Sequence, residues 1–203
     1  MEVFTLDNYH LALPNRPTPQ AREFRRIGAD VVIHHGAIVI GPEHIEIASN
    51  VIIDSGAILI ASAECPIAIG NYVHIGAHSS VGGGPIVFED FSGISHGVRL
   101  VGGNEDYSGL VPTNPTIPRE LRRVDRKGIT LGRHVVVGAN SVVLPMELPE
   151  GVAIGALSFV AIRAGMVEVP IEPWTIWAGS PLRKLGNRAV INTTVEQIRG
   201  FKP

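Results

Sequence analysis

The sequence has one cysteine, little charge and few aromatic side chains. Cys65 cannot form a disulfide within a single chain, so we expect a reducing compartment, the cytoplasm. Charged residues make up 18% of the chain and the formal net charge is −2, so neither nucleic acid nor an anionic membrane is an expected partner. No apolar run reaches the roughly 18 residues of a transmembrane helix. Acidic residues near the start argue against a signal peptide, and we expect no membrane insertion.

The small share of aromatic residues, 5%, restricts how the core can be built. Hydrophobic residues nevertheless make up 45% of the chain, which excludes an intrinsically disordered protein. The core must therefore consist of aliphatic and small side chains. Together with 23 glycines and 15 prolines in 203 residues, this composition favours one repetitive β domain.

Aliphatic residues return every six positions, a period that fits neither an α-helix nor a single β-strand. A small or polar residue usually follows each of them. Grouped in threes, these hexads form about six coils of roughly 18 residues. We expect the following residues to point into the core: Ile27, Ile33, Val39, Ile47, Ile53, Leu59, Ile69, Ile75, Val81, Val87, Ile94, Leu100, Leu131, Val137, Val143, Leu148, Ile154 and Val160.

A six-residue repeat suits an all-β solenoid of triangular section, in which each hexad supplies one short strand and one corner. A sandwich of many short strands would not keep the hexad phase through three consecutive turns. The hexads, clearest in the segments 75–80, 137–142 and 154–159, resemble the left-handed parallel β-helix of the hexapeptide-repeat acyltransferases over roughly residues 27 to 185. The left hand is implied only by this resemblance, since general chirality rules favour right-handed crossovers.

The hexads also divide the chain. Residues 1–26 form an N-terminal segment, in which 18–26 predict a short capping helix with Thr18 as its N-cap. The β-helix domain spans 27–165. The tail, 166–203, is expected to contain a short helix, because Thr193 and Glu196 have the spacing of a capping box. The polar loop 102–128 interrupts the coils, and a connection of this length in a compact domain is usually functional.

The inserted loop carries the most specific motifs. It reads Gly-Gly-Asn-Glu-Asp-Tyr-Ser-Gly over 102–109 and Asn-Pro-Thr-Ile-Pro over 114–118. It resembles the loop of nucleotide-sugar N-acyltransferases, although Glu105 and Asn114 replace an aspartate and a glycine of their pattern. The segment 172–181 resembles the closing motif of the same family. The resemblance implies acyl-CoA-dependent acylation of the amine of a nucleotide-linked amino sugar, such as dTDP-4-amino-4,6-dideoxyglucose, in cell-surface glycan biosynthesis.

The resemblance also implies which loop residues meet the substrate. Asp106 is the candidate catalytic carboxylate, with a solvated turn-capping carboxylate as the alternative. The candidate substrate-binding residues are Asn104, Glu105, Tyr107 and Ser108. Because two adjacent carboxylates would attract a sugar ammonium and repel a diphosphate, we expect the nucleotide to lie toward basic residues such as Arg119, Arg122 or Arg123.

His74 and His96 are the candidate proton acceptors. His74 precedes the inward Ile75 and is expected to face outward at a corner, in a Tyr-x-His-Ile stretch that the related enzymes carry near the sugar amine. His96 lies one coil nearer to the loop and is the rival, although the related enzymes often have serine or asparagine there. A structural role is the alternative for both, and His78 is expected at the surface.

The acceptor is expected to be an amine rather than a hydroxyl. An amine needs only a modest proton acceptor, whereas a hydroxyl needs a strong base, usually a positioned histidine. Sugar O-acetyltransferases of this superfamily carry that histidine at the start of the loop, where this sequence has Gly102, Gly103 and Asn104. The loop contains no histidine. Sugar O-acetylation is therefore the alternative function.

The resemblance implies a coenzyme A thioester, acetyl-CoA or another short acyl-CoA, as co-substrate, and no metal. Small residues on late coils would leave backbone groups open to the pantetheine arm, although tight corners demand the same residues. Basic side chains after the closing motif are candidate partners of the phosphates. The candidate coenzyme-binding residues are Gly138, Ala139, Ser141, Ala156, Ser158, Arg183 and Lys184.

A homotrimer with sites between neighbouring solenoids is the expected assembly, because the flat faces of a triangular prism pack around a threefold axis. Two other classes share the fold. Zinc-dependent carbonic anhydrases need three histidines, and His134 is the one histidine found in the fifth and sixth coils. A non-catalytic scaffold would not need the loop and tail motifs. The acyl group and the nucleotide sugar are left open.

Overall fold

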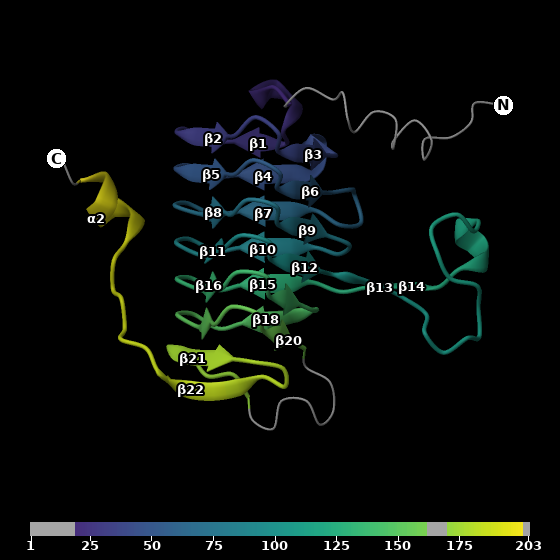
Figure 1. Ribbon diagram of the computed structural model, residues 1–203. Coiled ribbons are helices and arrows are strands. Elements are labelled where there is room, and N and C mark those ends of the chain that lie inside the picture. The colour runs from purple at the N-terminus through teal and green to yellow at the C-terminus, as the bar shows by residue number, and fades with distance from the viewer. Residues whose placement is uncertain (1–18, 162–169, 201–203) are drawn as a thin grey trace.

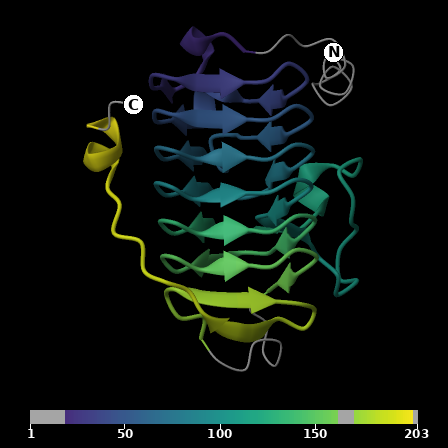
Figure 2. The ribbon, with the colours of Figure 1, turned by 60° about the vertical axis from the view of Figure 1, so that its left-hand side comes forward.

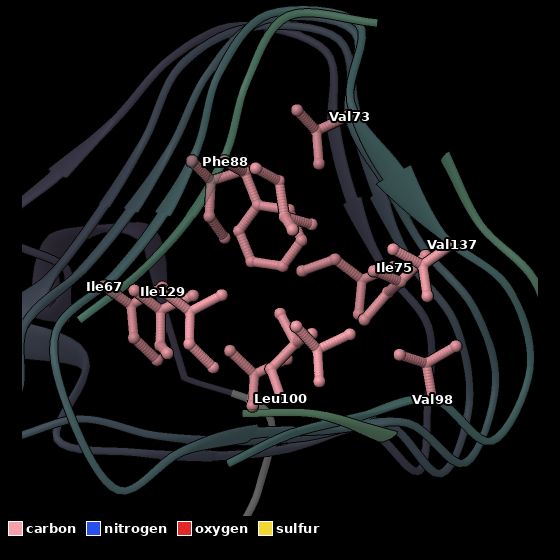
Figure 3. Packing of buried hydrophobic residues seen from close by; sticks show 14 of the residues in the cluster. Ile67, Val73, Ile75, Phe88, Val98, Leu100, Ile129 and Val137 are labelled. Atoms are coloured by element: carbon pink, nitrogen blue, oxygen red, sulfur yellow. The ribbon is translucent and has the colours of Figure 1, made fainter. Parts of the chain in front are cut away.

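Residues 19–161 and 170–200 are described by the computed structural model. They form a left-handed parallel β-helix of triangular cross-section, which confirms the predicted fold class (Figure 1, Figure 3). Three parallel sheets, here called A, B and C, make its three faces. Six complete coils are stacked, and one strand of a seventh turn follows them. Among the described residues, no helix is long and apolar enough to cross a membrane.

Each coil contributes one short strand to each sheet. Sheet A contains β1 (Arg26–Ile27), β4 (Ile45–Ile47), β7 (Ile67–Ile69), β10 (Ile86–Phe88), β15 (Ile129–Leu131) and β18 (Met146–Leu148). Sheet B contains β2 (Val31–Ile33), β5 (Val51–Ile53), β8 (His74–Ile75), β11 (Gly93–Ile94), β16 (Val136–Val137) and β19 (Ala153–Ile154). Sheet C contains β3 (Ile38–Ile40), β6 (Ile58–Ile60), β9 (Ser80–Gly82), β12 (Arg99–Val101), β17 (Val142–Val143) and β20 (Phe159–Val160).

The hexad residues point inward and stack from coil to coil, as Figure 3 shows for a section of the core. One predicted core position is wrong. Val87 faces outward, and Phe88 takes the inward place, in register with Ile69 and Leu131. The preceding corner, residues 82–85, reads Gly-Gly-Gly-Pro and is one residue longer than a regular hexad allows. This extra residue shifts the inward phase of the next strand by one position.

At the corner between sheets A and B, successive coils place a residue in the left-handed backbone conformation. Several of these residues are not glycine, and this conformation is uncommon in residues other than glycine. Tyr72, Phe91, His134 and Trp174 have φ values of 58°, 62°, 59° and 56°. Their rings stack in this order, with centroid distances of 5.3, 4.8 and 5.7 Å. Gly151 interrupts the column in the sixth coil, because a Cβ there would lie 2.2 Å from the Trp174 ring. The result is an aromatic ladder that ties four coils together.

Both ends differ in detail from the expectation. A 3₁₀-helix covers only Ala21–Glu23, with Gln20 as its N-cap, and strand β1 already begins at Arg26; Thr18, the expected cap, lies outside the described residues. The helix 18–26 is therefore wrong in extent, because residue 26 already pairs with the second coil. Helix α2 (Val195–Arg199) is confirmed, but its capping box is one residue later than predicted. Thr194 and Gln197 form it.

The first part of the segment assigned to the tail adds strands to the end of the solenoid, and the chain leaves the solenoid only after them. Strand β21 (Thr175–Ala178) pairs in parallel with β19, and β22 (Arg183–Asn187) returns antiparallel to β21. From there the chain runs back along the solenoid to α2 (Figure 1, Figure 2). The Arg188 guanidinium lies over the Trp174 ring and donates to the carbonyl of His134 at 2.7 Å, and Arg199 donates to Asn71 at 3.3 Å.

The inserted loop leaves the solenoid at the corner between sheets C and A. Its two ends pair as antiparallel strands β13 (Gly103–Glu105) and β14 (Val124–Arg126), and a 3₁₀-helix, η4, covers Arg119–Leu121. The loop projects from the side of the solenoid that lies away from β8 in Figure 1. Its two-stranded base makes it a projecting arm with its own secondary structure rather than a simple turn.

Candidate active site

The projecting loop encloses a cavity of about 700 Å³. The five loop residues predicted to meet the substrate all line it, together with basic and apolar residues from the returning strand. The lining residues are Asn104, Glu105, Asp106, Tyr107, Ser108, Leu110, Arg123, Val124, Asp125 and Lys127. The loop therefore brings the predicted substrate residues together in one concave surface.

The two adjacent carboxylates of the loop have different environments, which corrects the expectation of a doubly charged turn. Glu105 Oε1 accepts from Arg122 Nη1 at 2.7 Å, and both side chains are largely covered. Asp106 Oδ1 accepts from the backbone N–H of Ser108 at 2.8 Å and so closes a turn. Hydrogen bonds from the hydroxyl and backbone N–H of Ser108 lower the pKa of Asp106 below its ordinary value. Asp106 is therefore an ionised carboxylate that no cation of the described residues pairs with directly.

The arginines expected to meet the nucleotide also have separate roles. Arg119 pairs with Glu64, and Arg122 pairs with Glu105. The charges of both are therefore compensated within the chain. Arg123 lines the loop cavity. Among the described residues it forms no ion pair, so it is the loop arginine available to an anionic ligand.

Glu64 anchors the loop to an earlier coil. Its carboxylate contacts Arg119 near the loop tip and lies 3.9 Å from Nε of Arg126 at the loop base. Arg126 also donates to the carbonyl of Gly83 at 3.0 Å and lies 3.6 Å from Sγ of the buried Cys65. The guanidinium of Arg119 lowers the pKa of Glu64 by hydrogen bonding and by its charge, so this anchor is ionised at neutral pH.

His74 lies within strand β8 on the outward face of sheet B, rather than at a corner. Its Nε2 is 2.8 Å from Oδ2 of Asp54. The ring borders a second cavity of about 380 Å³, and Gly93, the register partner of His74 in the next coil, lines this cavity without a side chain. The residues around it are Tyr72, His74, Phe91, Ser92, Gly93, Ile94, Ser95, Val136, Val137, Gly138 and Ile154.

One chain does not bring the histidines and the loop carboxylate together. The strands that carry His74 and the arm that carries Asp106 lie on opposite sides of the solenoid in Figure 1. His96 lies in the exposed turn between sheets B and C and borders neither of the two cavities. His78 is exposed at the same corner, in the left-handed conformation, as expected for a surface residue.

A shallow groove follows the corner between sheets C and A from the loop toward the last coils. One cavity of about 210 Å³ shares Asn104, Asp125 and Lys127 with the loop cavity. A further cavity of about 220 Å³ shares Ala161 with this 210 Å³ cavity and reaches Ser180, Pro181 and Leu182. The groove therefore leads from the loop carboxylates to the residue before Arg183.

The predicted coenzyme residues separate into two groups. Gly138, Ala139 and Ala156 are accessible in turns between sheets B and C. Ser141 and Ser158 are buried, and their hydroxyls donate to the carbonyl of Gly155 at 3.0 and 2.7 Å. These two side chains close the turns of the solenoid and are not open to a ligand, so they are removed from the coenzyme site.

Of the two basic coenzyme candidates, only Arg183 has its charge available. Lys184 pairs with Glu172 at 2.7 Å, whereas Arg183 is exposed and has no ion pair among the described residues. Within the described ranges, no group of three or more His, Cys, Asp or Glu side chains is arranged to hold a metal ion.

Three residues near the second cavity were missed by the sequence analysis: Asp54, Ser95 and Tyr72. Each lies close to an inward aliphatic residue, Ile53, Ile94 or Ile75, so hexad phase marks the first two as outward-facing. The six-residue period therefore indicated that Asp54 and Ser95 face outward. It does not indicate which residue of the next coil lies beside each of them, because that depends on the lengths of the corners between the two coils.

Comparison with known proteins shows similarity over nearly the whole chain, although no family model matches it. The chain is 35% identical over 182 residues to a dTDP-4-amino-4,6-dideoxy-D-glucose acyltransferase of Escherichia coli, covering 89% of this chain and 90% of that one. It is also similar to AntD, an N-acyltransferase from Bacillus cereus. An aspartate variant of AntD in complex with dTDP and coenzyme A is 30% identical, with a TM-score of 0.73 over 92% of this chain and 90% of that chain.

Two further AntD structures extend this similarity. A serine variant in complex with dTDP-4-amino-4,6-dideoxyglucose and coenzyme A is 29% identical, with a TM-score of 0.73 over 92% of this chain and 91% of that chain. A complex with dTDP and 3-hydroxybutyryl-CoA is 30% identical, with a TM-score of 0.72 over 92% and 89% of the two chains.

Proposed function

Because the chain belongs to the dTDP-4-amino-4,6-dideoxyglucose N-acyltransferase family, we propose that it acylates the amine of a nucleotide-linked amino sugar at the loop cavity. The acyl donor is a coenzyme A thioester. The acceptor belongs to the class that the relatives bind, a dTDP-linked 4-amino-4,6-dideoxyhexose. Its product serves cell-surface glycan synthesis, and we place the enzyme in the cytoplasm, where a reduced Cys65 is stable.

The observation that carries this proposal is the chemistry of the loop cavity. It holds one ionised carboxylate, Asp106, without a cation paired to it in the described chain, and the loop contains no histidine. A sugar ammonium is the complement of such a carboxylate. Arg123 on the same wall supplies a positive charge for the diphosphate of the nucleotide. The start of the loop, Gly102, Gly103 and Asn104, has no histidine of the kind that sugar O-acetyltransferases of this fold carry there to activate a hydroxyl.

The reaction follows from these groups. The ammonium must lose a proton before its nitrogen can attack the thioester carbonyl carbon. Asp106 holds the ammonium, and His74 accepts the proton. The C–N bond then forms, the nitrogen loses its second proton to the departing sulfur as the oxyanion collapses and the C–S bond breaks, and the proton held by His74 passes to water. The products are the amide and free coenzyme A.

This scheme requires a second copy of the chain, because His74 and Asp106 lie on opposite sides of one solenoid. We propose a homotrimer in which the arm of one subunit reaches sheet B of the next. The outward face of sheet B supports this arrangement. Its side chains Val32, Ile52 and Val136 are apolar and 46%, 43% and 40% exposed, and a closed ring of three copies would bury all of them.

The groove along the C–A corner is the proposed path of the coenzyme. It begins at the loop cavity, where the thioester must react, and it ends beside Arg183, whose guanidinium suits a phosphate. In a trimer the accessible turns at Gly138, Ala139 and Ala156 of a neighbouring subunit would form the opposite wall. Small residues on that wall leave room for a pantetheine arm.

The test is a panel of dTDP-linked sugars assayed with several acyl-CoAs. Released thiol and the mass of the acylated sugar are the readouts. We expect thiol release with the 4-amino-4,6-dideoxyglucose nucleotide and none with the matched 4-hydroxy nucleotide, which differs only in the acceptor atom. Faster acylation of the 4-hydroxy nucleotide would instead identify a sugar O-acyltransferase.

A further inference from the structure

The outward face of sheet B carries a carboxylate that the scheme above does not use, paired with the imidazole of His74. Asp54, the residue after β5, lies with Oδ2 at 2.8 Å from Nε2 of His74 on β8. A carboxylate offers only acceptors, so Nε2 is the nitrogen that donates. In the neutral ring the proton is then on Nε2, and Nδ1 keeps the lone pair.

The coil register holds this pair in place. Ile52 is the direct partner of His74, and Ile53 is the partner of Ile75. The backbone N–H of Asp54 donates to the carbonyl of Ile75 at 2.9 Å. Because side chains alternate across a strand, Asp54 and His74 are diagonal neighbours on the same outward face. Two successive turns of a rigid solenoid therefore fix their separation.

The exposed fractions of the two side chains indicate which of them is fixed by its surroundings and which can be reached by a ligand. The Asp54 side chain is 23% exposed, whereas the His74 side chain is 52% exposed. A second imidazole, that of His34, lies with Nε2 at 3.9 Å from the other oxygen of Asp54. The carboxylate is thus the more enclosed member, seated between two coils, and the His74 ring is the member that a ligand in the adjoining cavity can reach.

We propose that Asp54 is a positioning residue for acyl transfer. By accepting from Nε2–H it fixes the tautomer and the ring orientation of His74, so that Nδ1 is the nitrogen that takes the proton from the sugar ammonium. The imidazolium that forms is then compensated by the Asp54 carboxylate, and the proton passes on to water. This inference rests on the proposed function, in which His74 is the proton acceptor.

The experiment compares Asp54→Asn with a matched control. Asparagine has nearly the size of aspartate but can present an N–H to the ring, which favours the wrong tautomer. We expect kcat to fall by roughly 10- to 100-fold, a part of the usual contribution of a general base, with KM for both substrates within about twofold of wild type. Glu46→Gln is the control, because Glu46 is a carboxylate in the same coil that pairs with Arg25 and Arg26 on sheet A. It is expected to keep wild-type kinetics.

A second measurement reads the tautomer without any assay of activity. In ¹⁵N-histidine-labelled wild-type protein, the neutral His74 ring is expected to show a protonated Nε2 and an unprotonated Nδ1, and Asp54→Asn is expected to shift that signature. Wild-type kcat in a folded Asp54→Asn variant would overturn the proposal. A protonated Nδ1 in the wild type would overturn it as well, even if the variant does not fold.

These outcomes are separable from the proposed function. If wild type and Glu46→Gln release no thiol with any amino sugar, the proposed function fails, and the tautomer measurement still decides whether Asp54 orients His74. If wild type is active and Asp54→Asn is equally active, the function stands and the positioning role is wrong.

Discussion

Arg122 Nη1 lies 2.7 Å from Oε1 of Glu105, within the inserted loop. The Arg122 side chain is 14% exposed and that of Glu105 is 27% exposed, so this pair is part of the packed base of the arm. Its consequence is electrostatic. Of the two adjacent carboxylates, Glu105 is compensated and Asp106 keeps its charge for a ligand.

Asp106→Asn tests that division of roles. We expect a higher KM for the amino sugar or a lower kcat, with affinity for acyl-CoA nearly unchanged, since the amide has the size of the carboxylate but not its charge. The ordinary pKa of an aspartate is about 4, and Ser108 lowers the pKa of Asp106 below that value. Asp106 therefore stays ionised at every pH above about 4, and its attraction for the ammonium is lost only at lower pH. The change should therefore be equal at pH 6 and pH 8, measured by steady-state kinetics. Equal losses for both substrates would show that Asp106 only builds the loop.

Glu64→Gln tests whether the arm must be anchored. The substitution removes the carboxylate that contacts Arg119 and Arg126. Exposed ion pairs contribute little, so we expect KM for the amino sugar to rise by roughly two- to fivefold, with faster proteolytic cleavage inside 102–128. Glu172→Gln, which breaks the Lys184 pair of the tail, is the matched control. Restored kinetics in the charge-swapped pair Glu64→Arg with Arg119→Glu would confirm the anchor, and unchanged kinetics in Glu64→Gln would exclude it.

His74→Ala is expected to lower turnover by about 10²- to 10⁴-fold, the usual contribution of a general base, with the fold intact. His96→Ala is expected to do less, because His96 lies in an exposed turn away from both cavities. The two variants are compared by kcat on the same amino sugar and by circular dichroism. Full activity in His74→Ala together with loss in His96→Ala would reverse the assignment of the base.

His134 provides a prediction about stability rather than catalysis. Its ring is 6% exposed and stacked between Phe91 and Trp174, and burial, helped by Arg133, lowers its pKa. The unfolded chain therefore takes up the proton first as the pH falls, and the free energy of unfolding decreases below the ordinary histidine pKa of about 6.5. In His134→Phe this loss between pH 7.5 and pH 5.5 should be smaller than in wild type. Denaturant unfolding at one protein concentration measures it, and identical losses in the two proteins would contradict the assignment.

Much of the fold could be predicted, because one property, the six-residue period, determines the strands, the corners and the inward face. The exception is Val87. It is aliphatic and lies six positions after Val81, as the period requires, but the corner 82–85 contains one extra residue, and Phe88 is therefore the inward residue. Both are apolar, so the sequence alone does not distinguish a long corner from a regular one.

The site was less predictable, because its contacts join residues from different coils. The loop residues were identified by their motif, but the pairing of Glu105 with Arg122 and of Arg119 with Glu64 depends on how the arm folds back. Ser141 and Ser158 have the residue type that suits a ligand-binding turn. Their hydroxyls donate to the carbonyl of Gly155 inside the solenoid, and this depends on how the turns fold in three dimensions.

The proposed active site combines His74 of one subunit with the arm of another, and mixing of subunits decides whether the site is shared in this way. His74→Ala and Asp106→Asn trimers, each of low activity, are unfolded together, refolded and assayed on the dTDP-linked 4-amino sugar. Random assembly should give about one quarter of the wild-type sites, since each site then draws one intact residue from each of two subunits. Each variant refolded alone is the control and should stay at its low activity. A mixture no more active than the two variants alone would contradict the shared site.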